Sequence, residues 1–210
     1  MGIWQLIAVA IAATLALSVV PVQAEIDEEF RMVTCGSVIK LRHASTGYRL
    51  HSHDIPYGSG SQQQSVTAHP AADDTNSLWT VKAGFGYPAC KHGDVIKSGD
   101  VIRLQHVNTK KYLHSHLHRS PLSQNQEVSA YGSSDQSDSG DNWIVEGAAK
   151  WLRGAKLRLK HKDTGAYLHS HRKAYQNPIP GQLEVCGVPS KNSQNFWHSE
   201  EGIYFAINES

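Results

Sequence analysis

Residues 36–53 read GSVIKLRHASTGYRLHSH, and this stretch returns as GDVIRLQHVNTKKYLHSH at 99–116 and as GAKLRLKHKDTGAYLHSH at 154–171. Matching glycines, histidines and leucines keep the same register in the three copies, and each copy closes on a tryptophan, at Trp79, Trp143 or Trp197. A repeat of about 60 residues is typical of a fold assembled from equivalent units. We name the predicted units by their residues: unit 1 is 30–84, unit 2 is 93–147 and unit 3 is 148–203.

Each copy begins with apolar and polar residues in strict alternation. In unit 1, Ile39 and Leu41 share one face of the predicted strand, and Lys40 lies on the other. A period of two indicates a strand, and the Thr-Gly that follows in two of the copies suits a tight hairpin. Lys110 occupies the place of that glycine in unit 2, which predicts a slightly strained turn. No copy shows the period of a helix, so we expect four strands in each unit.

One such unit alone leaves strand edges unpaired and an apolar face uncovered. Three units remove those edges by closing around a pseudo-threefold axis. The sequence therefore predicts an all-β chain folded as a β-trefoil, a six-stranded barrel capped by three hairpins. A propeller of six or seven blades needs more copies, and a β-sandwich does not require threefold repetition. We expect one domain, in which matched Leu, Ile, Val and Trp residues form a shared core.

The charge balance argues against nucleic-acid binding. The 210 residues contain 20 Lys and Arg against 19 Asp and Glu, a formal net charge of +1. Binding driven by phosphates needs a surplus of Lys and Arg. With 40% hydrophobic and 19% charged residues, most of the chain is expected to fold.

The first 24 residues contain no Asp, Glu, Lys or Arg, and residues 6–20 form an almost unbroken apolar run. Short side chains at Val22 and Ala24 predict cleavage after Ala24, so we interpret 1–24 as a signal peptide. The alternative is a retained membrane anchor, because residues 3–20 approach the length that spans a bilayer. We expect no span in the mature chain, which would then be lumenal or secreted.

Three cysteines fit an oxidising compartment, where an odd number predicts one disulfide and one free thiol. Cys35 and Cys90 flank the body of unit 1, so a bridge between them would cross-link that unit. In the chain-entropy account such a loop stabilises by roughly 3–4 kcal/mol. Cys186 is then the free thiol. The chain has no C-x-x-C pattern, which argues against a redox enzyme of thioredoxin type.

The LHSH element offers the most suggestive chemistry. Alternation places Leu50 and Ser52 on one face of a strand and His51 and His53 on the other, where the histidines face outward or line a loop pocket. Two histidines so spaced can ligate a metal, but a stable zinc site usually needs a third or fourth ligand. The nearby extra ligands are His118 and Asp54. We therefore expect no metal site. The favoured interpretation is that these histidines form hydrogen bonds that hold the strand ends, and the alternative is that they form a binding surface.

Tyr57 and Tyr175 follow the histidine pairs at similar offsets. As exposed aromatic side chains they would suit stacking on sugar rings or contact with a protein partner. The complete set of candidate partner-binding or glycan-binding residues is His51, His53, Asp54, Tyr57, His114, His116, His169, His171 and Tyr175.

A further set of histidines, His43, His106 and His161, lies on the apolar face of the first strand of each unit. We expect these to be buried imidazoles bonded to the backbone. Catalysis has little support, because the chain has no G-x-S-x-G, H-E-x-x-H or phosphate-binding loop. Neighbouring acids such as Asp73 and Asp74 are interpreted as solvated surface groups. The sequence thus predicts a protein that is not an enzyme and needs no cofactor.

Three segments resemble MIR motifs: LRHASTGYRLHSH, LQHVNTKKYLHSH and LKHKDTGAYLHSH. Shorter pieces match as well, among them His53-Asp54, Ser120-Pro121 and Glu201-Gly202-Ile203. A signal peptide followed by three MIR units and almost nothing else resembles the stromal cell-derived factor 2 family. The resemblance covers residues 34–210 and implies a β-trefoil protein of the endoplasmic reticulum.

The same resemblance implies partners. In that family they are a J-domain co-chaperone and the lumenal heat-shock ATPase, and the role is quality control of secretory and membrane glycoproteins. The chain ends Ile207-Asn208-Glu209-Ser210, which is not a KDEL-like retention signal. Residence in the lumen would then depend on a retained partner, with some secretion. A lectin-like module that binds mannose or another glycan is the alternative, and a glycan-modifying enzyme is a third hypothesis.

Overall fold

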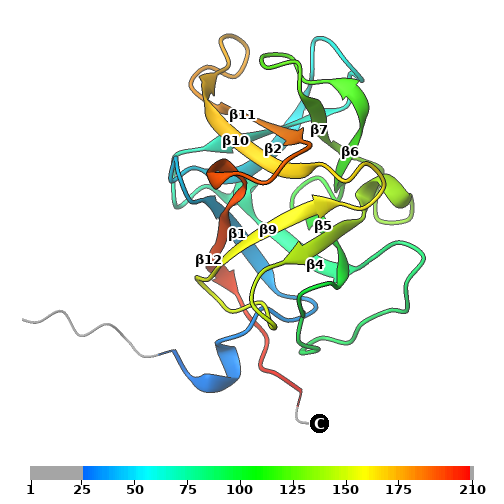
Figure 1. Ribbon diagram of the computed structural model, residues 1–210, viewed down its shortest axis with the longest axis vertical. Helices are drawn as coiled ribbons and strands as arrows, with labels where there is room; N and C mark the ends of the chain where they lie inside the picture. Colours follow the sequence, from blue (N-terminus) through cyan, green and yellow to red (C-terminus); the bar gives the residue numbers. More distant parts are fainter. Residues whose placement is uncertain (1–25, 209–210) are drawn as a thin grey trace, which may run out of the picture.

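Twelve strands and four very short 3-10 helices make up the computed structural model, which describes residues 26–208 (Figure 1). The predicted signal peptide, 1–24, lies outside the described residues. In the described part of the chain no helix is long and apolar enough to cross a membrane. The strands are β1 (Val38–His43), β2 (Arg49–Pro56), β3 (Gln64–His69), β4 (Trp79–Ala83), β5 (Val101–His106), β6 (Tyr112–Arg119), β7 (Gln126–Tyr131), β8 (Trp143–Glu146), β9 (Lys156–His161), β10 (Tyr167–Ala174), β11 (Leu183–Val188) and β12 (Trp197–Ile203). The helices are η1 (Glu28–Phe30), η2 (Thr75–Ser77), η3 (Ser139–Asp141) and η4 (Ser193–Asn195).

The first and last strands of each unit form a closed barrel. β1 pairs with β4, β4 with β5, β5 with β8, β8 with β9, β9 with β12, and β12 returns to β1. All of these pairings are antiparallel. The ring of six strands has no open edge, which is the property that a single unit lacks.

The middle strands form the cap. β2 and β3, β6 and β7, and β10 and β11 are hairpins, and their second strands touch one another in a triangle through β3–β7, β7–β11 and β11–β3. Figure 1 shows these hairpins at one end of the barrel and both ends of the described chain at the other. A six-stranded barrel with a cap of three hairpins confirms the predicted β-trefoil.

Equivalent residues from the three units fill the core. Trp79, Trp143 and Trp197 have no exposed surface. Their indole Nε1 atoms donate to the backbone oxygens of Leu50, Leu113 and Leu168, at 2.9, 2.9 and 3.1 Å. Each tryptophan thus fastens the barrel to the cap hairpin of its own unit, while its ring contributes to the common apolar interior.

The second set of histidines is buried, as predicted. The Nε2 atoms of His43, His106 and His161 lie 2.8, 2.9 and 2.9 Å from the carbonyl oxygens of Gln194, Asn76 and Gly140. Since a carbonyl only accepts, Nε2 carries the proton, and Nδ1 accepts from a threonine hydroxyl 2.9 Å away in every unit. Burial lowers the pKa of all three rings, so they remain neutral.

The hairpin between the first two strands of each unit requires a left-handed residue. Gly47 and Gly165 have φ values of 76° and 73°, and Lys110 adopts 62° at the same place in unit 2. The prediction that Lys110 replaces glycine in a strained turn is therefore confirmed.

One disulfide joins Cys35 and Cys90 across 55 residues, and Cys186 is a buried free thiol, as predicted. Cys90 belongs to the long connection between β4 and β5, so the disulfide links this connection to the segment immediately before β1. Burial raises the pKa of the Cys186 thiol to about 12, which leaves it protonated and unreactive.

Replacing both bridged cysteines, as Cys35→Ser with Cys90→Ser, is expected to lower the free energy of unfolding by roughly 3–4 kcal/mol, because the unfolded chain regains the entropy of the closed loop. Urea denaturation of the oxidised parent and the variant measures the difference. Cys186→Ser is the matched control for loss of a thiol. Equal urea midpoints of parent and double variant would contradict the expectation.

Candidate functional site

The LHSH elements lie on the first strand of each cap hairpin, β2, β6 and β10, with the predicted orientation of leucine and serine. Leu50, Leu113 and Leu168 are fully buried. The hydroxyls of Ser52, Ser115 and Ser170 donate to backbone oxygens of the partner strand, at 2.8, 2.7 and 2.9 Å. These residues hold each hairpin together. The histidines occupy the opposite face, as the alternation predicts.

The first histidine of each pair is buried, not outward-facing. His51, His114 and His169 are 3%, 6% and 8% exposed. A 3-10 helix of the same unit folds over each ring, where His51 Nδ1 meets Asp74, His114 Nδ1 meets Asp141, and His169 Nδ1 meets the side-chain nitrogen of Asn195. The alternation of residues along a strand predicts on which face a side chain lies, but it does not predict which other segment covers that face. Because the three units are arranged around a threefold axis, their histidine pairs do not come together in one site.

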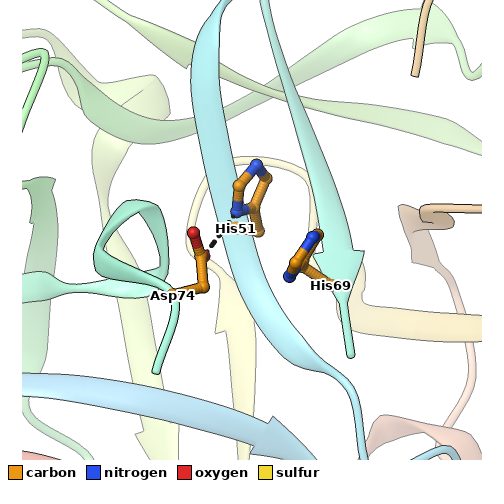
Figure 2. A group of neighbouring side chains, drawn as sticks. All are labelled: His51, His69 and Asp74. Atoms are coloured by element: carbon orange, nitrogen blue, oxygen red, sulfur yellow. Dashed lines mark hydrogen bonds and ion pairs between the residues drawn. The ribbon is translucent and has the colours of Figure 1, made fainter. Parts of the chain in front are cut away.

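In unit 1 the histidines form a hydrogen-bonded chain, part of which Figure 2 shows. His51 Nδ1 lies 2.7 Å from Asp74 Oδ2, and His51 Nε2 lies 3.1 Å from His53 Nδ1. Burial, the largest effect, lowers the pKa of His51 to about 4 despite the Asp74 carboxylate. The neutral His51 ring therefore donates from Nδ1 to Asp74 and accepts at Nε2 from His53. A third ring, His69, stacks on His51 with centroids 4.9 Å apart.

In units 2 and 3 the second histidine bonds a buried glutamate. His116 Nε2 lies 2.9 Å from Glu127 Oε1, and His171 Nε2 lies 2.8 Å from Glu184 Oε2. Both carboxylates have no exposed surface. Unit 1 has Ser65 at the equivalent position, directly before the valine of β3, so His53 lacks such a partner.

The two glutamates also hold loops of the preceding unit. Glu184 accepts from the backbone nitrogens of Leu122 and Ser123, at 2.7 and 3.2 Å. Glu127 accepts from the backbone nitrogen and the hydroxyl of Ser61. Although burial works in the opposite direction, these donors and the histidine lower the pKa of Glu184 to about 2 and that of Glu127 below its usual value. Each histidine–glutamate pair thus fixes the contact between neighbouring hairpins.

The expected exposure of Tyr57 and Tyr175 is wrong. They are 5% and 8% exposed, and their ring centroids lie 6.3 Å apart in an apolar cluster with Ile179. The Tyr57 hydroxyl donates to the Val66 carbonyl oxygen at 2.7 Å and lies 3.0 Å from that of Val128. It therefore joins β3 to β7. Both tyrosines fill the middle of the cap, because side chains at the ends of β2 and β10 meet where the three hairpins converge.

Asp54 remains on the surface. Its side chain is 86% exposed, with Lys111 Nζ 3.8 Å away. The interpretation of Asp74 as a solvated group is wrong, because Asp74 accepts from His51, from the Ser77 hydroxyl at 2.6 Å and from the Asn76 nitrogen. A sequence signal for this role exists, because Asp74 lies five residues before Trp79, at the N-cap of η2, where an acidic side chain is preferred.

Two clefts lie between neighbouring units on the side of the cap. The larger, of about 600 Å³, is lined by His116, Leu117, Gln126, Asp163 and Thr164, among others. The other, of about 330 Å³, is lined by Asp54, Pro56, Gln64, Lys111 and Tyr131, among others. Gln64 and Gln126 are equivalent and each donates to a threonine of the next unit, at 2.9 and 2.8 Å. Clefts rich in amide, hydroxyl and imidazole groups suit a ligand with several hydroxyls.

The chain is similar to known proteins that carry the same repeat. The MIR domain family matches residues 55–150. Stromal cell-derived factor 2-like protein of Arabidopsis thaliana is 54% identical over 181 residues, which cover 85% of this chain and 83% of the relative. Human stromal cell-derived factor 2 is 46% identical over 179 residues, covering 85% of this chain and 84% of the relative. These relatives are named as factors rather than as enzymes.

Solved structures show the same similarity. The crystal structure of the SDF2-like protein from Arabidopsis thaliana superposes with a TM-score of 0.82 at 51% identity, over 85% of this chain and 99% of that one. A protein O-mannosyltransferase complex of S. cerevisiae bound to the sugar donor gives a TM-score of 0.73 at 30% identity. That match covers 89% of this chain but only 29% of the transferase chain, so it concerns one part of a longer protein.

Proposed function

The chain belongs to the stromal cell-derived factor 2 family, and we propose that it is a non-catalytic protein of the endoplasmic reticulum lumen. It works there with a J-domain co-chaperone and the lumenal heat-shock ATPase in the folding and quality control of secretory and membrane glycoproteins. The observation that carries the proposal is the similarity to SDF2-like proteins over 85% of the chain. The disulfide Cys35–Cys90 supports an oxidising compartment.

The connection between β4 and β5 supports a protein partner. It presents Phe85 and Tyr87, each 44% exposed. The side chain of Asn142, which is 3% exposed, bonds both backbone polar groups of Phe85, at 2.7 and 3.1 Å, and Cys90 is tied to Cys35. The backbone that carries these aromatic side chains is thus held in place before binding, which reduces the entropy lost on association. We propose this connection as the contact for the co-chaperone.

Affinity purification tests this proposal. Protein carrying a tag and a lumenal leader is recovered from the endoplasmic reticulum after mild lysis, with an unrelated lumenal protein as the control bait. We expect a J-domain co-chaperone in the eluate, and a clear loss with Phe85→Ser and Tyr87→Ser combined. Leu117→Ser, at a side chain 83% exposed on the cap, is the matched control and is expected to retain the partner. Recovery of no chaperone would count against the proposed function.

The polar cleft between units 2 and 3 favours a second candidate, a lectin-like module that binds mannose or another glycan on client proteins. Of the candidate residues, Asp54, His116 and His171 keep side-chain surface exposed, whereas the Nε2 atom of His53 is buried. On a glycan array this hypothesis predicts binding that His116→Ala or Asp163→Ala, both in this cleft, abolishes. A glycan signal that survives both substitutions, or the absence of any signal, would reject it.

A further inference from the structure

The outer face of the cap hairpin of unit 1 gathers three imidazoles. β2 and β3 pair with Leu50 opposite Ala68 and His51 opposite Thr67, and the side chains of Leu50 and Ala68 point into the core. His51, His53 and His69 therefore project from the other face. The N-cap residue of η2, Asp74, lies over the same face, as Figure 2 shows for His51, His69 and Asp74.

The distances between these groups fit a cation. One possible ligand atom from each of His51, His69 and Asp74 lies within 4.8 Å of the other two. In a tetrahedral site with metal–ligand bonds of about 2.0–2.1 Å, ligand atoms are separated by about 3.3 Å. Binding lengthens the 2.7 Å His51–Asp74 contact and shifts the His51 proton from Nδ1 to Nε2, which then donates to His53 Nδ1 and leaves His51 Nδ1 free to ligate the ion.

We infer that His51, His69 and Asp74 form a binding site for a divalent transition-metal ion of the zinc class. Two imidazoles and one carboxylate leave a fourth position for water or another ligand, a donor set that zinc accepts. His53, whose Nδ1 lies 3.1 Å from His51 Nε2, orients the His51 ring from behind. The Nε2 atom of His53 is itself buried without a hydrogen-bond partner among the described residues.

The other two units show why the site is confined to unit 1. His69 corresponds to Tyr131 in unit 2 and to Val188 in unit 3, at the ends of β7 and β11. Unit 2 offers one imidazole with two acids, His114, Asp138 and Asp141. Unit 3 offers one imidazole, His171, with Glu184 and Cys186, and neither the Glu184 carboxylate nor the Cys186 thiol has exposed surface.

Metal titration of the folded protein without a histidine tag tests the inference. After treatment with EDTA and its removal, the protein is titrated with ZnCl2 by calorimetry and with Co²⁺ by visible absorption, where intense d–d bands report tetrahedral coordination. We expect one ion per chain. His69→Tyr introduces the residue that unit 2 carries at this place, and Asp74→Asn removes the carboxylate charge. Each is expected to weaken binding about 100-fold or more.

Two matched variants separate this site from other sources of binding. His118→Ala removes an exposed histidine near the cluster of unit 2, and Asp138→Asn removes a carboxylate of that cluster. Both are expected to leave zinc affinity unchanged. Circular dichroism and melting in EDTA establish that each variant is folded, and imidazole NMR signals of His51 and His69 are expected to shift on adding Zn²⁺. Absence of binding in the parent, unchanged affinity in folded His69→Tyr, or loss of affinity only in Asp138→Asn would overturn the inference.

Discussion

Trp143→Ala is expected to lower the free energy of unfolding by about 3–5 kcal/mol, the cost of truncating a large aromatic side chain in a packed core. The Trp143 ring has no exposed surface and lies 5.0 Å from the His161 ring, centroid to centroid. Its indole also bonds the Leu113 carbonyl of the cap at 2.9 Å. Truncation leaves a cavity and an unpaired buried carbonyl oxygen, and both destabilise the folded state.

Urea denaturation followed by circular dichroism measures this loss. Leu117→Ala is the control, because Leu117 is 83% exposed and a change there is expected to stay within about 0.5 kcal/mol. Trp79→Ala and Trp197→Ala are expected to cost as much as Trp143→Ala, since the three rings occupy equivalent places. A loss below about 1 kcal/mol at Trp143 would contradict the packing described for the core.

Glu184→Gln is expected to destabilise the protein by about 3 kcal/mol at neutral pH, because a buried carboxylate that accepts several hydrogen bonds is replaced by a neutral amide that cannot accept them all. The carboxylate accepts from two backbone nitrogens of the preceding cap loop and from His171. The backbone nitrogen of Lys173 donates to His171 Nδ1 at 3.1 Å, so the His171 proton resides on Nε2 and points at Glu184. The side-chain NH₂ group of a glutamine at position 184 would face N–H donors that the carboxylate now accepts from. The hydrogen bonds that remain would also lack the charge of the carboxylate.

The pH dependence of this variant has a defined sign. The pKa of Glu184 falls from 4.5 to about 2 on folding, so its carboxylate stabilises the folded state above pH 4.5. That contribution, on the order of 3 kcal/mol, disappears as the pH falls through about 2. The difference in stability between parent and Glu184→Gln is therefore expected to narrow from pH 4.5 downward.

Urea denaturation of both proteins across this pH range measures the difference in their free energies of unfolding. The contributions of the other acidic residues are the same in both proteins and cancel in this difference. Glu201→Gln is the matched control. Glu201 pairs with Arg49 but its side chain is 41% exposed, so its loss is expected to cost less than about 1 kcal/mol. A constant difference between parent and Glu184→Gln from neutral to acid pH would show that Glu184 does not carry its charge into the folded state.

The architecture was predictable because the decisive information is periodic. Alternation from Ile39 to His43 defines a strand, and its return at equal register demands a closed threefold arrangement. The disulfide followed from the compartment and from the odd number of cysteines. Such features depend on local pattern and on repetition, both of which a sequence displays directly.

The site was predicted only in part, because its chemistry depends on differences between the units. His69 and Asp74 approach His51 through hairpin register and through a 3-10 helix, neither of which is visible in the LHSH spacing. Glu127 and Glu184 reach across to the preceding unit, a contact that only closure of the cap creates. The prediction that Tyr57 is exposed was wrong for the same reason. Its spacing from the histidines does not show that its side chain packs at the centre of the cap, where the three hairpins meet.

The three units share one core and are therefore expected to unfold together. Monitoring equilibrium unfolding with a separate probe in each unit tests this expectation most directly. The indole N–H signals of Trp79, Trp143 and Trp197 in ¹⁵N–¹H spectra report one predicted unit each. The account predicts that all three native signals vanish at the same urea concentration, and that Trp79→Ala lowers this midpoint equally for the two remaining indoles. Distinct midpoints, or an effect of Trp79→Ala limited to unit 1, would contradict it.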